Sequence, residues 1–303
     1  MHNLDLHGIV AYPITPFREE DGSVDADMLV RLIDRLIDAG VHAIAPLGST
    51  GESAYLSESE WRHVVETSVI RVAKRVPVIV GISELTTAAA ARRASFAEEA
   101  GADAIMVLPT SYWKLGEEEV FQHYARIAAA TGLPIMAYNN PATSGIDMSP
   151  ELMIRMVREI DNVRMIKESS GDIQRMHRIH ELSGGTVPFF NGSNPLALEA
   201  FAAGATGWCT AAACLIPEQT LGLYAAVQSG NLATARRAFY RQLPLLQFIL
   251  KGGLPKTVKA GLRLQGLDVG APRHPVLPLD EAGCRSLAAI LGQVAAGEAR
   301  SAA

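Results

Sequence analysis

The chain has 303 residues, of which 49% are hydrophobic and 19% are charged, and its formal net charge is −5. This length and composition predict a globular protein with a large core, built as one or two domains. No long basic run and no long uncharged apolar stretch is present, so nucleic acid and membrane are not expected partners.

Cysteine and histidine are used sparingly and without pattern. Cys209, Cys214 and Cys284 form no metal-ligand spacing, and an odd count without a disulfide framework is typical of reduced thiols in a cytoplasmic protein. Residues 1–8 lack a basic region followed by an apolar one, so no signal peptide is expected. The eight histidines are scattered, and we expect neither a metal nor another cofactor.

Short apolar stretches alternate with amphipathic ones along most of the chain. Predicted strands cover residues 8–17, 43–48, 77–82, 104–109, 134–139, 163–168, 187–192 and 206–210. Predicted helices cover residues 25–39, 86–100 and 117–131, and further helices begin after the capping residues Ser57, Ser149 and Asp172. Several of these helices end at a glycine just before the next strand, which is the usual C-terminal stop.

Eight strands separated by helices predict an α/β protein with a parallel (β/α)₈ barrel. A doubly wound open sheet is the alternative, although the glycine fingerprint of a dinucleotide fold is missing after the first strand. Beyond Pro217 the chain is predicted to be helical, with breaks near residues 252–253 and 266–275. We therefore expect a barrel core, residues 1–216, with a C-terminal helical extension, residues 217–303, packed on it as one domain overall.

Lys167 is an unusual residue for its place near the end of an apolar strand. Alternation puts it on the same face as Val163 and Met165. If that face looks into a barrel, the amine loses its hydration, which favours the neutral form, and a neutral amine attacks carbonyl carbon. The alternative is a lysine that extends to solvent at the strand end, and the strand alone does not decide between the two.

Polar residues follow the predicted strands, where the active site of such a barrel lies. Residues 48–53 form either a plain turn or a pocket whose backbone N–H groups bind an anion. Tyr138 shares a face with Met136, so it is either a core residue or a hydroxyl that moves protons beside the lysine.

Three motifs stand together in order and spacing: Gly48-Ser49-Thr50-Gly51-Glu52, Tyr138-Asn139-Asn140-Pro141 and Lys167-Glu168-Ser169-Ser170-Gly171. With them the chain resembles the dihydrodipicolinate synthase / N-acetylneuraminate lyase family, from residue 8 to at least residue 217. The resemblance implies a TIM barrel and a class I lyase of aldolase type, which forms a Schiff base through a lysine. It also implies a homotetramer built as a dimer of dimers.

The resemblance assigns the chemistry to four side chains. Lys167 would attack the ketone of pyruvate or another small 2-oxo acid, and Tyr138 would relay protons to and from the substrate. Thr50 would link Tyr138 to Tyr112, which resembles a tyrosine that family members reach across a subunit boundary.

The resemblance also implies which residues bind the substrate. The backbone N–H groups of Ser49 and Thr50 would hold the carboxylate of the 2-oxo acid. Gly192 and the carbonyl of Cys209 match positions that line the imine pocket. Thr143 occupies a further substrate position, five residues after the tyrosine.

Two departures from the family pattern bear on the substrate. Thr143 stands where dihydrodipicolinate synthases carry an arginine for the second substrate's carboxylate, and threonine offers no bidentate cation. Asn194 and Pro195 stand where sialic-acid lyases carry acidic residues that bind polyol hydroxyls. The Asn-Asn-Pro form of the tyrosine motif looks more like members that dehydrate, deaminate or cleave small 2-oxo acids.

We therefore expect a Schiff-base lyase that catalyses aldol cleavage or condensation, dehydration or deamination of a 2-oxo acid. A true 4-hydroxy-tetrahydrodipicolinate synthase is one alternative, and a non-catalytic 2-oxo acid sensor on the same barrel is another. A phosphate-binding barrel enzyme would need a glycine-rich loop after the seventh strand, and residues 191–194 are a thin match.

Overall fold

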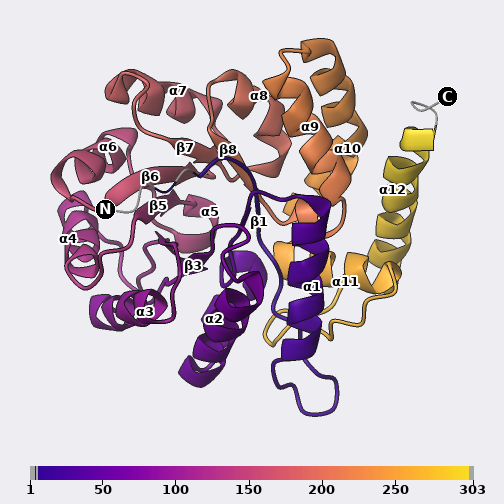
Figure 1. The fold of residues 1–303 in the computed structure, drawn as a ribbon, viewed down its shortest axis with the longest axis horizontal. Coiled ribbons are helices and arrows are strands. Elements are labelled where there is room, and N and C mark those ends of the chain that lie inside the picture. Colours follow the sequence, from indigo (N-terminus) through magenta and orange to yellow (C-terminus); the bar gives the residue numbers. More distant parts are fainter. Residues whose placement is uncertain (1–3, 5, 300–303) are drawn as a thin grey trace.

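The computed structural model describes residue 4 and residues 6–299, and it shows eight parallel strands surrounded by helices (Figure 1). The strands are β1 (Gly8–Ala11), β2 (Ala43–Ile44), β3 (Ile79–Gly81), β4 (Ala104–Val107), β5 (Ile135–Asn139), β6 (Val163–Glu168), β7 (Phe189–Asn191) and β8 (Gly207–Thr210). Half of the segment used to judge a signal peptide, residues 1–3 and 5, lies outside the described residues.

The strands close into a barrel. They pair in the order β2-β1-β8-β7-β6-β5-β4-β3, each parallel to its neighbours. The two ends of this order meet through a parallel bridge between Ile44 and Val78, and the Gly81 N–H donates to the Pro46 carbonyl at 3.1 Å. The predicted (β/α)₈ fold is confirmed, and the open doubly wound sheet is wrong.

The first two strands are shorter than predicted. Pro13, Pro16 and Pro46 lie in the stretches that fail to form regular ladders, because proline has no N–H to donate. The chain still follows the barrel wall there, since Tyr12 N–H donates to Thr210 O at 3.1 Å and Ala45 N–H donates to Ala11 O at 2.8 Å. The ends of the strands are therefore irregular where the functional residues begin.

An outer layer of helices covers the barrel (Figure 1). These helices are α1 (Ala26–Ala39), α2 (Glu58–Val72), α3 (Thr87–Glu99), α4 (Glu117–Ala128), α6 (Pro150–Glu159), α7 (Ile173–Ser183), α8 (Ala197–Ala202) and α9 (Pro217–Gln228). Their starts agree with the sequence: side chains of Asp25, Ser57, Thr86, Ser149 and Asp172 accept backbone N–H groups of the first turns.

Short helical turns, which the sequence did not predict, follow several strands. They are η1 (Ser49–Gly51), η2 (Ser53–Tyr55), α5 (Pro141–Ser144), η3 (Asn194–Leu196) and η4 (Ala212–Cys214). They lie in the loops after β2, β5, β7 and β8, with η2 following η1, so these turns shape the backbone at the carboxyl end of the barrel.

Three further helices, α10 (Leu232–Gly252), α11 (Leu254–Leu264) and α12 (Glu281–Ala299), stack together on one side of the barrel (Figure 1). The predicted breaks are present: Gly253 has φ 88° between α10 and α11, and residues 265–280 form no helix. The boundary between residues 216 and 217 falls just before α9, which contacts both β1 and α10, and the division into core and extension stays a prediction.

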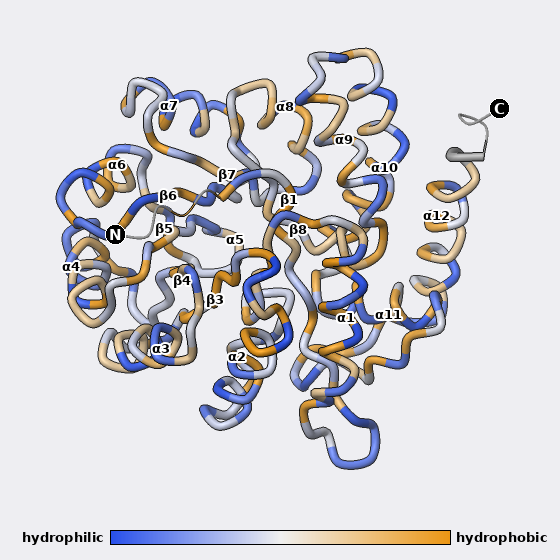
Figure 2. The backbone as a smooth tube through the Cα atoms, in the orientation of Figure 1, coloured by the Kyte–Doolittle hydropathy of each residue, from blue (hydrophilic) through white to orange (hydrophobic). Residues whose placement is uncertain are grey.

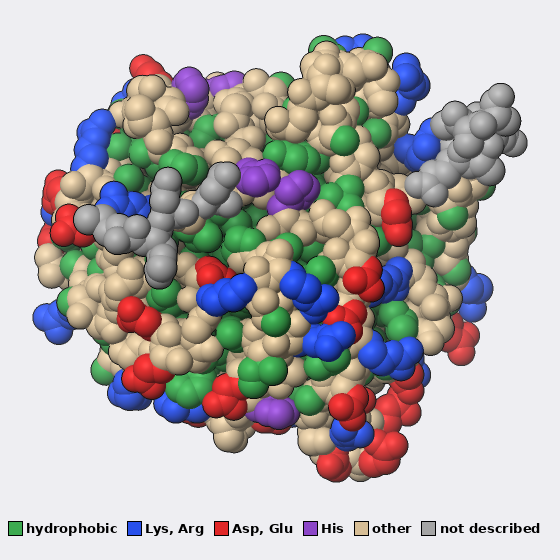
Figure 3. Space-filling model, viewed as in Figure 1, with side chains coloured by type: hydrophobic (Ala, Val, Ile, Leu, Met, Phe, Trp, Pro, Cys, Tyr) green, Lys and Arg blue, Asp and Glu red, His purple; other side chains and the backbone are tan. Residues whose placement is uncertain are grey.

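The core fills the barrel and the space between strands and helices. Ile9, Ile44, Ile105 and Ile166, each on a different strand, are fully buried. The helices show both hydrophobic and hydrophilic bands along the tube in Figure 2, as amphipathic helices do. Figure 3 shows acidic and basic side chains interspersed over one face. No helix within the described ranges combines the length and apolarity that crossing a bilayer requires.

Glycine is required where the barrel closes. A Cβ on Gly81 would lie 2.1 Å from the carbonyl oxygen of Leu47, whose own φ is 64°. We expect Gly81→Ala to lower the free energy of unfolding by about 1–3 kcal/mol, because backbone must shift to admit the methyl group. Urea unfolding followed by circular dichroism measures this change.

The matched control is Gly222→Ala on the exposed side of α9, where a Cβ would meet no atom within 4 Å. That variant should be more stable by about 0.5–1 kcal/mol, since alanine is the better helix residue. Equal stability of both variants would contradict the tight contact between Leu47 and Gly81.

Candidate active site

The side chain of Lys167 lies inside the barrel, near the end of β6. It is only 4% exposed, and its Nζ lies 3.8 Å from the ring centroid of Tyr138 and 3.9 Å from that of Tyr12. Nζ also lies 3.8 Å from Sδ of Met106 on β4. Among the described residues no carboxylate pairs with this amine, so it faces aromatic rings and a thioether and is not held in an ion pair.

Strand register places Tyr138 beside Lys167. The two residues are direct partners in the parallel ladder between β5 and β6, so their side chains emerge on the same face. The Tyr138 hydroxyl accepts a hydrogen bond from the Asn140 side-chain amide at 2.8 Å. Asn140 lies two residues after the tyrosine, and sequence reasoning gave it no role of its own.

Tyr12 is a site residue that sequence reasoning missed. It directly follows β1, is 3% exposed, and its hydroxyl donates to Sδ of Met106 at 3.1 Å. Burial, together with the nearby Cys209 thiol, raises the pKa of Tyr12 well above its usual range. The signal in the sequence was its place: an aromatic residue at the carboxyl end of a barrel strand.

Cys209 and Gly192 both lie against the lysine. Burial raises the pKa of the Cys209 thiol, while the charge of Lys167 and a hydrogen bond with Tyr12 act in the opposite direction. A Cβ on Gly192 would lie 2.8 Å from Cε of Lys167 and 1.8 Å from Oγ of Ser169. Glycine is therefore needed at position 192 because a Cβ there would collide with the Ser169 hydroxyl and also with the lysine side chain.

The turn after β2 presents two free backbone donors. The N–H groups of Gly51 and Glu52 bond to Gly48 O and Ser49 O, whereas those of Ser49 and Thr50 make no hydrogen bond within the described part of the chain. The Thr15 hydroxyl donates to Gly51 O at 2.7 Å and holds the turn against the segment that follows β1. This arrangement fits the predicted anion pocket.

Two expected contacts of Thr50 are not formed in this single chain. Thr50 is buried, yet no hydrogen bond of the described residues joins it to Tyr138 or Tyr112. Tyr112 is 91% exposed and stacks edge-on against Trp113, which is 77% exposed. The proton relay from Thr50 therefore stays a prediction, and Asn140 is the residue that bonds to Tyr138.

The positions that depart from the family pattern have other contacts. Thr143 lies on α5, is exposed, and brings no charge to the rim. Asn194 Oδ1 accepts from the Trp208 indole at 3.2 Å and from the Thr210 hydroxyl at 2.8 Å. Asn194 thus binds two side chains of β8, and these two hydrogen bonds already use its Oδ1.

Glu168 secures the end of the lysine strand. It is fully buried, its Oε2 lies 3.2 Å from Nε of Arg175 on α7, and the same oxygen accepts from Asn139 at 3.1 Å. Its Oε1 accepts the Ser170 N–H at 2.6 Å. The carboxylate therefore ties β6 to β5 and α7, which agrees with a structural role. No three His, Cys, Asp or Glu side chains of the described residues gather as metal ligands.

Known proteins were compared with this chain. The model of the dihydrodipicolinate synthetase family matches residues 5–294. The chain belongs to this family. It is therefore an enzyme of the class I lyase type.

Relatives and solved structures cover nearly the whole chain. The 4-hydroxy-tetrahydrodipicolinate synthase of Bacillus subtilis is 34% identical over 93% of this chain and 97% of its own length. That of Methanopyrus kandleri is 34% identical over 89% and 90%. A provisionally named dihydrodipicolinate synthetase from Pseudomonas aeruginosa is 62% identical, with a TM-score of 0.94, over 96% of this chain and 100% of the other.

These names bear on the subgroup. The curated relatives carry the name of the synthase, so the comparisons give no support to a closer likeness to the dehydratases, deaminases and aldolases. The comparisons therefore establish the family of this chain but not which reaction it catalyses.

Gly192→Ala tests whether the lysine has to pass over a bare backbone position. We expect the rate of imine formation with pyruvate to fall by at least about tenfold, because the added methyl group displaces Cε of Lys167. Borohydride trapping followed by mass spectrometry over time measures that rate. The control is again Gly222→Ala, which should react like the wild type, and an unchanged rate in the Gly192 variant would contradict the contact.

Proposed function

We propose that this enzyme forms a Schiff base between Nζ of Lys167 and the carbonyl carbon of pyruvate or another small 2-oxo acid. The observation that carries the proposal is the buried amine, which faces Tyr12 and Tyr138 and has no carboxylate partner in the described part of the chain. An amine in such surroundings is a nucleophile for carbonyl carbon.

Imine formation proceeds through a carbinolamine. The lone pair of Nζ attacks C2 while one proton moves from Nζ to the carbonyl oxygen, which gives the neutral carbinolamine. A second proton, delivered through the Tyr138 hydroxyl, lets that oxygen leave as water, and the protonated imine that remains draws electrons from the neighbouring bonds. A proton at C3 then becomes acidic, a C–C bond breaks or forms, or a leaving group such as water or ammonia is expelled.

The neighbouring groups supply proton transfer and binding. The Tyr138 hydroxyl, bonded to Asn140, is the proposed proton relay, with Thr50 and Tyr112 completing it. The N–H groups of Ser49 and Thr50 are proposed to hold the substrate carboxylate. Gly192 and the Cys209 carbonyl are proposed to line the imine pocket, and Thr143 the outer part of the substrate site.

A second candidate is 4-hydroxy-tetrahydrodipicolinate synthase itself. The names of the curated relatives favour it. The exposed Thr143 argues against it, because a carboxylate of a second substrate would find no bidentate cation at that position. Product analysis decides between the two: formation of 4-hydroxy-tetrahydrodipicolinate from pyruvate and an aldehyde co-substrate would establish the synthase, and turnover of 2-oxo acids alone would establish a cleavage or elimination enzyme.

Trapping the imine tests the central step. The enzyme is incubated with pyruvate and borohydride, its intact mass is measured, and the adduct is located by peptide mapping. We expect a stable pyruvyl adduct on Lys167 and none on Lys259, the other buried lysine, which is paired with Glu52. Lys167→Ala should give no adduct, and full activity in that variant would rule out the mechanism.

Tyr138→Phe separates imine formation from proton transfer. We expect turnover to fall by roughly 10²–10⁴-fold while the borohydride adduct still forms, because the ring stays and only the proton-transferring hydroxyl is removed. Steady-state rates and trapping yields measure the two steps on the same preparation. Loss of the adduct together with the activity would contradict the proposal that Lys167 forms the imine and Tyr138 only transfers protons.

We also propose that the chain works in the cytoplasm as a homotetramer, a dimer of dimers. Support comes from Tyr112 and Trp113, large aromatic side chains that a single chain leaves exposed beside the carboxyl ends of the strands. Analytical ultracentrifugation gives the oligomeric state, and the same fractions are assayed for activity. A fully active monomer would contradict the role of Tyr112 as a residue supplied by a neighbouring subunit.

A further inference from the structure

A second buried lysine stands behind the turn that carries the two free N–H groups. Lys259 on α11 is 1% exposed, and its Nζ lies 2.8 Å from Oε1 of Glu52, which is also 1% exposed. Glu52 directly follows η1 (Ser49–Gly51) in the chain. A helix from the C-terminal part of the chain is thus joined by charge to the turn at the barrel rim.

We infer that the ion pair between Glu52 and Lys259 is a positioning device: it holds the Ser49–Gly51 turn in the shape that presents its N–H groups to the substrate carboxylate. The inference rests on the proposed function of that turn. It makes Lys259 and Glu52 positioning residues, since neither is proposed to touch the substrate.

The backbone at Glu52 needs such support. Its φ of 55° is in the left-handed region, which residues other than glycine and asparagine rarely adopt. The N–H of this residue closes the η1 turn by donating to Ser49 O. A left-handed backbone conformation persists only where neighbouring groups hold the residue in place. At Glu52 these groups are bound to its side-chain carboxylate.

Glu52 is held from two elements at once. Its Oε1 contact with Lys259 is ionic, and its Oε2 accepts the backbone N–H of Arg273 at 2.7 Å. Lys259 in turn donates to Ala271 O at 3.0 Å and lies 4.0 Å from the ring centroid of Phe17. The carboxylate therefore fixes η1 against α11 and against residues 271–273, which are distant in the sequence.

The charges of the pair depend on each other. Burial lowers the pKa of Lys259 to about 8, and the charge of Glu52 opposes that fall. A charge buried to this degree is tolerated only with a partner, so removing one member leaves the other uncompensated. The rearrangement that follows would be felt first by the turn to which Glu52 belongs.

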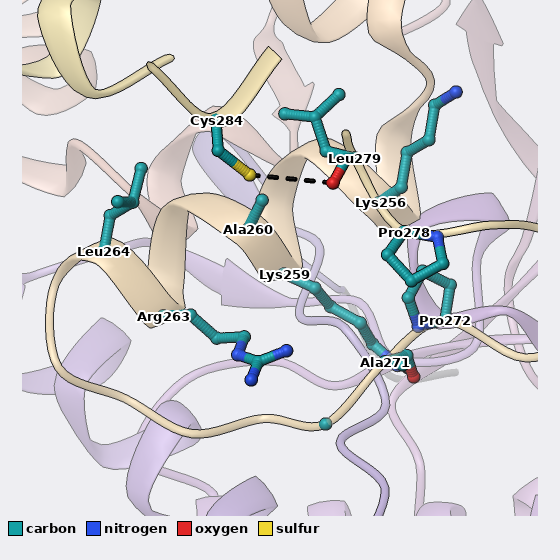
Figure 4. A pocket seen from close by; sticks show the side chains of 11 residues that line it. Lys256, Lys259, Ala260, Arg263, Leu264, Ala271, Pro272, Pro278, Leu279 and Cys284 are labelled. Carbon is teal, nitrogen blue, oxygen red and sulfur yellow. Dashed lines mark hydrogen bonds between the residues drawn. The ribbon is translucent and has the colours of Figure 1, made fainter. Parts of the chain in front are cut away.

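A cavity beside α11 supplies the control residue. It has a volume of about 240 Å³ and is lined by residues of α11, of the 270–279 segment and of the start of α12. Figure 4 shows the Lys259 side chain running from α11 toward Ala271 and Pro272, whereas that of Lys256 points away from it. Lys256→Met removes a positive charge from the same helix and cavity without touching the pair.

Hydrogen exchange tests the positioning directly. In Glu52→Gln and in Lys259→Met, the hydrogen-bonded backbone amides of Gly51 and Glu52, which close the turn, should exchange at least about tenfold faster than in the wild type. Mass spectrometry on peptides covering residues 47–55 measures this exchange. Lys256→Met should exchange like the wild type, and Lys259→Arg, which keeps the charge, should lie between. Unchanged exchange in both Glu52→Gln and Lys259→Met would overturn the inference.

Steady-state kinetics tests the consequence for the substrate. In both variants KM for the 2-oxo acid should rise by about tenfold with a smaller change in kcat, because carboxylate binding is weakened while Lys167 and Tyr138 stay in place. The double variant should be no worse than either single one, since both charges of the pair are then gone. Faster exchange with an unchanged KM would overturn the link to carboxylate binding.

Failure of the proposed function gives a different result. If the wild type forms no imine with any 2-oxo acid, the proposed chemistry is wrong, while the exchange rates still decide whether the pair orders the turn. If the wild type forms the imine and the variants keep both exchange rates and KM, only the positioning role is wrong.

Discussion

The architecture of the site depends on placing one amine inside the mouth of the barrel. Lys167 is 4% exposed, and a polar group so buried has to be accommodated by the residues around it. The β5–β6 register supplies the Tyr138 ring, Tyr12 supplies a second ring, and Gly192 leaves room for the lysine stem. None of these neighbours is a carboxylate, and a carboxylate there would hold the amine in an ion pair and oppose its proposed role as a nucleophile.

Two buried carboxylates lie at the end of β6 and in the loop after β2, and each is paired with a cation other than Lys167. Glu168 is paired with Arg175 on α7, and Glu52 is paired with Lys259 on α11. Both are fully or nearly fully buried and both lie next to a motif residue, so each fixes the backbone of its motif without entering the chemistry. Two cations from the helix layer, Arg175 and Lys259, therefore stabilise the rim of the barrel. Because Lys259 lies on α11, the C-terminal helices take part in holding the rim.

The sequence was informative wherever a local pattern carried the structure. Alternation of apolar and amphipathic stretches predicted the eight strands, and helix caps such as Asp25 and Ser57 were found where local chemistry placed them. Tyr12 was missed because it lay inside the predicted strand over residues 8–17, where an aromatic residue looks like core. Lys259 was missed because a lysine in an amphipathic helix looks solvent-exposed, and its partner Glu52 is distant in the chain. The short turns after the strands depend on tertiary contacts, such as that of Thr15 with Gly51. A local sequence pattern does not predict such contacts.

Family membership and the proposed substrate choice rest on different parts of the molecule. The match to the family runs over residues 5–294, whereas the proposed imine formation rests on the inner layer around Lys167 and Tyr138. We propose that a second substrate would bind farther out, where an exposed Thr143 offers a hydroxyl in place of a cation. A site built for a carboxylate loses much of its discrimination when its charged partner is absent, because specificity is a difference between competing substrates. The shared name of the relatives therefore supports the proposed inner chemistry, and we propose that the substrate is selected at the outer rim, where Thr143 lies.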